Sequence, residues 1–143
     1  MKRFSTALCL LFVLLTGTGL AAQKADPDFQ TYLKSVQGLD VSQPEDAQKA
    51  AQAFILYLQA AAPHNRVAIV SHMDKTLLVD GKASLPLEAI LDDSVTSCVA
   101  KAEHGEVFAR NMVEYMVGYG CIWFTFTDNK AEQPIIFAVN RVE

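Results

Sequence analysis

The sequence lacks clusters of basic residues, and it lacks an apolar run long enough to cross a bilayer. The whole chain has 12 Lys and Arg residues against 16 Asp and Glu residues. Because nucleic-acid binding depends on neutralising phosphates, nucleic acid is not an expected partner. Anionic membrane surfaces are excluded for the same reason. The longest apolar run, Ala7–Leu15, is far shorter than the roughly 20 residues that span a membrane.

Catalytic signatures are also missing. The chain contains no Gly-x-Ser-x-Gly, no phosphate-binding loop and no Cys-x-x-Cys pair. One segment, Ile69–Leu78, resembles the phosphatase signature of the haloacid-dehalogenase-like family. That chemistry requires a nucleophilic aspartate where this chain has His72, and a glycine where it has Lys75. We therefore expect no phosphoryl transfer at this segment.

The pattern of histidines and acidic residues does not form a metal motif. His72 and Asp74 would face the same side of a strand, but a zinc site needs three or four ligands. His64 and His104 adjoin loop signals, and nothing in the sequence places them near His72. We expect surface histidines. The acidic turn at residues 128–132 offers fewer oxygens than calcium prefers. No metal and no cofactor is expected.

The N-terminal segment has the order of a secretory signal peptide. Lys2 and Arg3 precede the apolar run, and small residues follow it as far as Ala22. We expect a signal peptide at residues 1–22 and a single domain at residues 23–143, working in the periplasm or secreted, with no membrane attachment after cleavage. A retained membrane anchor is the alternative. Cleavage would leave ten basic against sixteen acidic residues, a net charge of −6.

Two cysteines remain after cleavage, Cys98 and Cys121. An even number of cysteines in an oxidising compartment favours a disulfide. Two separate buried thiols are the alternative. Cys9 lies inside the apolar run and would be lost with the signal peptide.

The hydrophobic periodicity changes from helical to alternating along the domain. It predicts helices at 28–36, 44–62, 84–91 and 92–102. It predicts strands at 76–79, 112–117, 121–127 and 134–140, with a tight turn at Asp80–Gly81. The segment 66–73 fits either a helix or a strand. Helices first and strands last indicate an α+β fold, in which N-terminal helices pack on a C-terminal antiparallel β-meander.

A resemblance adds to this outline. The string Met116–Phe124, the closing segment Ala138–Asn140 and the earlier segments Val79–Lys82 and Leu87–Leu91 look like a pattern in small exported bacterial proteins. Their domain resembles the nuclear-transport-factor/ketosteroid-isomerase-like fold. The resemblance implies a curved antiparallel sheet that forms a cone around the helices. Such a fold sometimes hosts an isomerase or hydratase, whose working groups here would be Glu114 or Tyr115.

Aromatic residues gather on the predicted meander. Tyr115, Tyr119 and Trp123 lie near one hairpin, with Phe124 and Phe126 on the alternate face. Three interpretations stay open for these residues: core, cavity lining or a binding surface. A binding surface is included because Trp and Tyr dominate interface hot spots.

We expect a non-catalytic periplasmic binding module, in particular an inhibitor or immunity protein whose partner is a secreted toxin or a cell-wall enzyme. The acidic charge suits a basic partner. The alternatives are a small isomerase or hydratase and a structural subunit of an envelope assembly. The sequence does not fix the oligomeric state.

The signal peptide gives the first testable prediction. Mass spectrometry of the exported protein should find an N-terminus at Ala22 or Gln23, because small residues precede both positions. An intact Met1 on the exported protein would contradict it.

Overall fold

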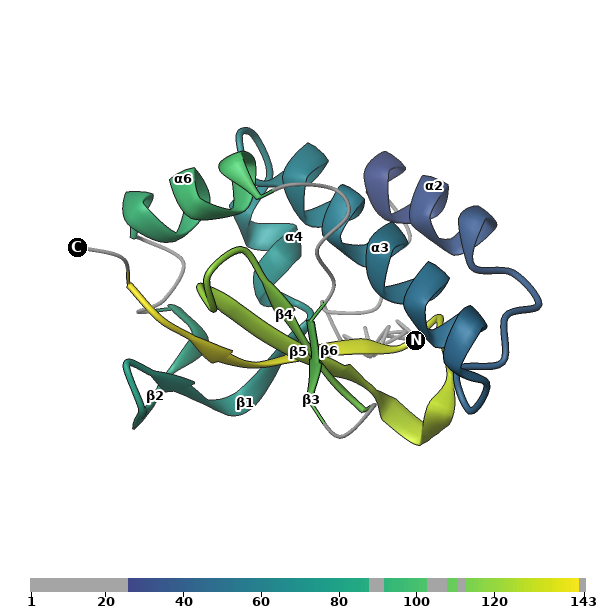
Figure 1. Ribbon diagram of the computed structural model, residues 1–143. Helices are drawn as coiled ribbons and strands as arrows, with labels where there is room; N and C mark the ends of the chain where they lie inside the picture. Colours follow the sequence, from purple (N-terminus) through teal and green to yellow (C-terminus); the bar gives the residue numbers. More distant parts are fainter. Residues whose placement is uncertain (1–25, 88–91, 103–107, 111–112, 142–143) are drawn as a thin grey trace, which may run out of the picture.

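The computed structural model describes residues 26–87, 92–102, 108–110 and 113–141. The expected signal peptide at 1–22 and the end of the expected helix at 84–91 lie outside these residues. The described chain is an α+β arrangement of two layers. Helices α2 (Pro27–Ser35), α3 (Pro44–Ala61) and α6 (Asp93–Lys101) lie on one side of a β-sheet (Figure 1).

Local sequence explains where the helices begin. Asp26 caps α2 by accepting a hydrogen bond from the backbone N–H of Asp28, and proline occupies the first turn of α2. Asp92 caps α6 in the same way through the N–H of Ser94. The predicted helices over 28–36, 44–62 and 92–102 are therefore confirmed, within the one or two residues by which helix ends vary.

The ambiguous segment contains both kinds of structure. Helix α4 covers Arg66–Val70, and strand β1 begins two residues beyond its cap, at Met73, and runs to Val79. The predicted tight turn then connects β1 to β2 (Lys82–Ser84). Asp80 and Gly81 both have positive φ, of 51° and 76°, as a two-residue turn between antiparallel strands requires.

The sheet has six strands in the order β2-β1-β6-β5-β4-β3. Strands β4 (Glu114–Val117), β5 (Ile122–Phe126) and β6 (Pro134–Val139) form the predicted antiparallel meander. Strand β3 (Phe108–Arg110) adds an antiparallel edge that the sequence analysis missed.

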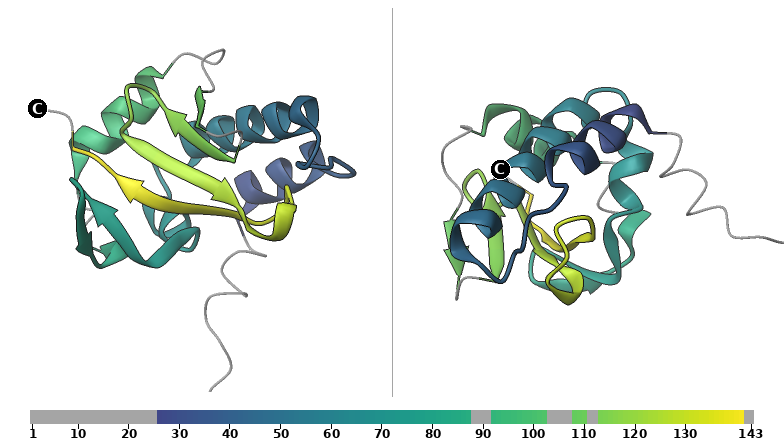
Figure 2. Two further views of the ribbon diagram at one scale, coloured as in Figure 1. Left: turned by 60° about the horizontal axis from the view of Figure 1, so that its bottom comes forward. Right: turned by 90° about the vertical axis from the view of Figure 1, so that its right-hand side faces the viewer.

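Two expectations about the sheet are corrected. Strand β1 pairs with β6 in parallel, so the sheet is mixed rather than purely antiparallel. It is also open, neither closed nor strongly curled, so it does not form the cone that the resemblance implied (Figure 2). Strand β1 lies beside β6, the last described strand, although β2, α6 and the first two strands of the meander separate them in sequence. Alternation of apolar residues predicts strands but not which strands become neighbours.

The core lies between the helices and the sheet. Alternate residues of β5 and β4 are buried on the helix side, and α3 contributes a stripe that contains four alanines, Ala47, Ala50, Ala51 and Ala61. The small side chains allow close approach, while the fully buried Phe54 fills the centre. The ring of Phe54 lies 4.8 Å from that of Phe124 on β5, so α3 is joined to the middle of the sheet.

The expected disulfide is present. Cys98 on α6 is bonded to Cys121 at the start of β5, and their Cα atoms are 6.4 Å apart. Helix α6 is thereby attached to the hairpin of β4 and β5. The structure has this bond in place of the alternative of two separate thiols.

Loss of this bond should destabilise the fold. The bridge spans 23 residues of sequence, for which the chain-entropy model gives roughly 3 kcal/mol. We expect Cys121→Ala to lower the free energy of unfolding by about 2–5 kcal/mol in urea titrations. Thiol titration of the denatured, unreduced protein should find no free cysteine after export. Two reactive thiols per chain would contradict the bridge in the isolated protein.

Candidate functional site

The turn between β4 and β5 exposes an aromatic side chain. Tyr119 is 99% exposed, the highest value among the large hydrophobic residues of the described chain. It stands between Gly118 and Gly120, whose φ values of 57° and 92° are in the region that favours glycine. The backbone N–H of Gly120 donates to the carbonyl of Val117 and closes the turn. An exposed tyrosine at the tip of a closed turn can contact another molecule without rearrangement of the backbone.

The turn is held from three directions. The disulfide of Cys121 attaches it to α6, and the side-chain amide of Asn140 donates to the carbonyl of Gly120 at 2.8 Å. A Cβ atom at position 118 would also meet the Sγ of Cys98 at 3.1 Å, a tight contact that adds to the preference of this positive φ for glycine. These contacts join the turn to the helix layer and to the end of β6.

The structure separates the three predicted aromatic residues. Trp123 is half-buried and faces away from the helices, opposite Met116 and Ala138 on the neighbouring strands. Its indole nitrogen lies beside Gly120, so Trp123 belongs to the same end of the hairpin as Tyr119. Tyr115 points the other way, is 3% exposed and stacks on Phe124 within the core. Tyr119 and Trp123 can form one surface, and Tyr115 supports it from inside.

Glu114 and Tyr115, the groups considered for the enzyme alternative, do not face a common site. Glu114 and Tyr115 are neighbours on a strand, so their side chains point to opposite faces of the sheet. Tyr115 lies in the core, where burial raises the pKa of its phenol. No acid–base pair is formed between them.

A second region was missed by the sequence analysis. His72 was expected at the surface, and that expectation is wrong, because its side chain is 4% exposed. Its ring lies 4.5 Å from Phe29 and 5.3 Å from Tyr57, between ring centroids. The Tyr57 hydroxyl in turn donates to the buried carboxylate of Asp26 at 3.1 Å. The N-cap of α2, the C-terminal part of α3 and the residue before β1 thus bring an acid, a phenol and an imidazole together.

Burial sets the protonation of His72. Desolvation lowers the pKa of its imidazole to about 4, although the charge of Asp26 and a hydrogen bond with the Pro134 backbone act in the opposite direction. The ring is therefore neutral at physiological pH. Because proline offers only a carbonyl, the ring donates one N–H to Pro134. Its Nε2 atom is buried without a hydrogen-bond partner among the described residues.

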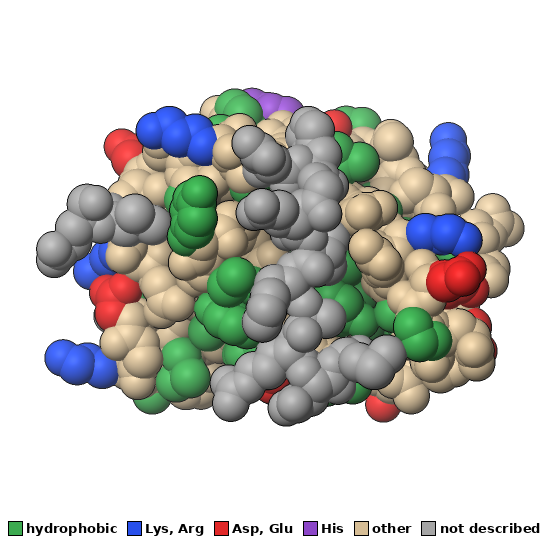
Figure 3. Space-filling view, in the orientation of Figure 1, with side chains coloured by type: hydrophobic (Ala, Val, Ile, Leu, Met, Phe, Trp, Pro, Cys, Tyr) green, Lys and Arg blue, Asp and Glu red, His purple; other side chains and the backbone are tan. Residues whose placement is uncertain are grey.

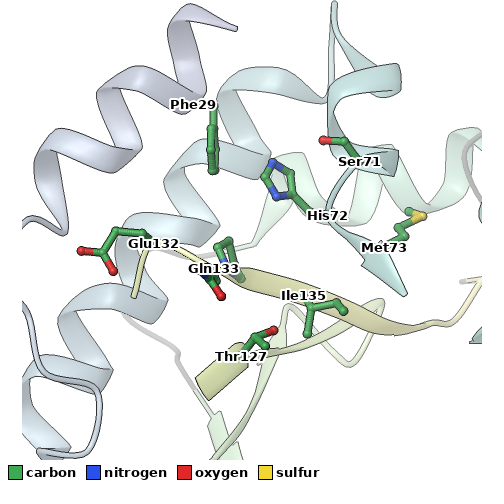
Figure 4. A pocket seen from close by; sticks show the side chains of 9 residues that line it. Phe29, Ser71, His72, Met73, Thr127, Glu132, Gln133 and Ile135 are labelled. Carbon is green, nitrogen blue, oxygen red and sulfur yellow. The ribbon is translucent and has the colours of Figure 1, made fainter. Parts of the chain in front are cut away.

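A cavity of about 190 Å³ opens beside this histidine. Apolar or aromatic side chains form part of its lining and include Phe29, Met73 and Ile135 (Figure 4). Polar side chains complete the lining and are contributed by Ser71, Thr127, Glu132 and Gln133. The cavity lies near η1 (Thr127–Asn129) and the start of β6, at the opposite end of β5 from Tyr119.

The other histidines and acids considered as ligands stand apart. His64 is exposed at the surface as expected, with its Nε2 atom 3.0 Å from a carboxylate oxygen of Asp28, and His104 lies outside the described residues. Asp74 accepts a hydrogen bond from the N–H of Thr76 within its own strand. Within the described ranges, no three His, Cys, Asp or Glu side chains come close enough to share a metal ion. The acidic turn at 128–132 is mostly exposed.

In the described part of the chain, no helix is both long enough and apolar enough to cross a membrane. On the face shown in Figure 3, acidic and basic side chains are interspersed around the edge and hydrophobic side chains gather towards the middle.

One signal in the sequence marks a single member of the buried polar cluster. Asp26 directly before Pro27 is the arrangement of an N-cap followed by a proline in the first helical turn. It predicts where α2 begins, but not that the same carboxylate also accepts from Tyr57. That contact depends on how α2 and α3 pack, which the sequence does not specify.

Comparison with protein-family models, with curated proteins and with solved structures finds no match for this chain. The site must therefore be interpreted from its own geometry.

The buried histidine makes stability depend on pH. Below about pH 6.5 the unfolded chain binds a proton at His72, which the folded protein accepts only near pH 4. The free energy of unfolding should therefore fall as the pH is lowered from 6.5 to 4, by up to roughly 3 kcal/mol from this residue. Urea titrations across this range should show a smaller fall for His72→Phe than for the unmodified protein. The variant His64→Phe, at an exposed histidine, should retain most of the fall. Titration of His72 near pH 6.5 in the folded protein, followed by NMR, would contradict its burial.

Proposed function

We propose that this protein is a non-catalytic binding module of the cell envelope or the secreted fraction, and that the turn carrying Tyr119 and Trp123 is its contact surface for a protein. The observation that supports the proposal most directly is the exposure of Tyr119 on a turn that is held in place. A large aromatic side chain that stays in water does not stabilise the fold. Burial of the same side chain against a partner contributes favourable binding free energy, and tyrosine is enriched among residues that carry binding energy.

The rigidity of the turn supports the same proposal. A mobile loop loses conformational entropy when a partner orders it. Here the disulfide, the Asn140 hydrogen bond and the close fit at Gly118 have already fixed the backbone before binding. The half-buried Trp123 adds apolar area next to the exposed ring. A small, preorganised aromatic patch suits the interface of an inhibitor better than the active site of an enzyme, which needs an acid, base or nucleophile held beside a substrate.

The finer proposal is an inhibitor or immunity protein directed against a secreted toxin or a cell-wall enzyme. The net charge of −4 for the whole chain, and −6 without the expected signal peptide, favours a basic partner. Complementary charge accelerates encounter even where it adds little affinity.

The proposal is tested by removing the exposed ring. Immobilised protein should retain one dominant protein from the envelope and secreted fractions of the source organism. We expect Tyr119→Ala to weaken that complex by about 30-fold or more, the effect of losing a hot-spot side chain worth about 2 kcal/mol. The thermal midpoint should be almost unchanged, because the side chain makes little contact with the fold.

A matched control separates this effect from a general loss of exposed apolar surface. Val67 on α4 is 74% exposed and lies outside the turn, so Val67→Ala should leave the affinity unchanged. If Tyr119→Ala lowers the thermal midpoint by several degrees, the ring supports the fold and is not a contact residue. If no partner is retained and a substrate is turned over instead, the binding proposal is wrong.

A further inference from the structure

We infer that the cavity beside His72 is a binding site for a primary ammonium group on a short alkyl chain. The cavity lies at the opposite end of β5 from Tyr119, so this inference does not depend on the proposed contact surface. It rests on the charge, the hydrogen-bonding character and the size of the lining.

The charge of the lining is negative. Among the described residues, Glu132 is the only charged side chain that lines the cavity, and no lysine or arginine does. The charge of Glu132 also acts on the buried interior next to the cavity, since it contributes, after burial, to raising the pKa of the Tyr32 phenol. Asp26 acts on His72 from the other side and opposes the fall of its pKa. A cation entering the cavity is attracted by both carboxylates, and an anion is repelled.

The lining offers several hydrogen-bond acceptors. The carboxylate of Glu132 accepts only, while the side-chain amide of Gln133 and the hydroxyls of Ser71 and Thr127 can each accept as well as donate. Nε2 of the neutral His72 is a buried acceptor that has no donor among the described residues. His72 is one of the lining residues, and a buried polar atom without a partner is costly, so a donor that reaches Nε2 is favoured. An ammonium group carries three donors and no acceptor, which matches this set.

The size and the walls define the rest of the ligand. The volume of about 190 Å³ is below the range of about 300–1,000 Å³ that holds drug-sized molecules. One short chain fits, and the apolar side chains of Met73 and Ile135 can pack against its methylene groups. The ring of Phe29 lines the same space beside His72 (Figure 4) and offers an aromatic surface to a cation. A lysine side chain of a partner and a free alkylamine share this chemistry.

The experiment uses n-butylammonium as the probe and 1-butanol as a neutral molecule of the same length. The exported protein is titrated with each, and binding is followed by NMR at the amides of Phe29 and Ile135. We expect saturable shifts with n-butylammonium and at least five-fold weaker binding of 1-butanol. Equal binding of the two probes, or no saturable shift with n-butylammonium, would overturn the inference.

Variants test the role of the carboxylate. Glu132 is exposed, so Glu132→Gln should leave the fold intact while it weakens n-butylammonium binding by about three-fold to ten-fold. The control is Glu45→Gln, which removes the same charge from an exposed position in the first turn of α3 and should have no such effect. Equal effects of the two variants would show that only net charge attracts the probe and would overturn the site.

Two arms distinguish the sources of the ammonium group once binding of the probe is established. If n-butylammonium competes with the partner protein, and Glu132→Gln weakens that complex, the occupant is a lysine side chain of the partner. If the probe binds without affecting the complex, the occupant is a free amine. Loss of the complex in Tyr119→Ala with unchanged probe binding would confirm that the two sites act separately.

Discussion

The packing of Phe54 is the contact on which the two layers depend. Its ring is fully buried and lies within 6 Å, between ring centroids, of Tyr32 on α2, Tyr57 on α3, His72 before β1 and Phe124 on β5. Four segments that are distant in sequence therefore meet at one side chain. Aromatic pairs at these distances contribute beyond their buried area. Truncation of such a ring in a close-packed core typically costs about 3–5 kcal/mol, so the position of α3 over the sheet is set largely here.

Polar groups inside this aromatic cluster constrain it further. The carboxylate of Asp26 is buried, and burying a charge is tolerated only when hydrogen bonds replace those of water. The N–H of Asp28 and the hydroxyl of Tyr57 supply two of them, so the cap of α2 is also a link to α3. His72 satisfies one nitrogen through Pro134 and leaves the other unpaired. Asp26 thus has hydrogen-bond donors within the cluster, whereas Nε2 of His72 has no partner among the described residues.

The sequence predicted those features that depend on neighbouring residues. Helices α2, α3 and α6, the turn at Asp80–Gly81 and the meander follow from periodicity, capping residues and turn residues. What it did not reveal depends on contacts between distant segments: the parallel pairing of β1 with β6, the burial of His72 and the contact between Asp26 and Tyr57. The sequence analysis grouped Tyr115 with Trp123, opposite Phe124, and that grouping is wrong, because the register of β4 against β5 pairs Tyr115 with Phe124 on the face that the helices cover.

The two proposed sites lie at opposite ends of β5. One is an exposed aromatic side chain on a turn, and the other is a cavity. At one end, the disulfide and Gly118 fix a turn so that the ring of Tyr119 stays in water, where a flat partner surface can cover it. At the other end, Glu132 and His72 line a cavity, and Nε2 of His72 is buried without a donor among the described residues. An aromatic tip contributes area and a cavity contributes selectivity for one chemical group. Because β5 belongs to the centre of the sheet, a single partner that engages both ends would be held across a rigid element, and neither contact would have to order the chain when it forms.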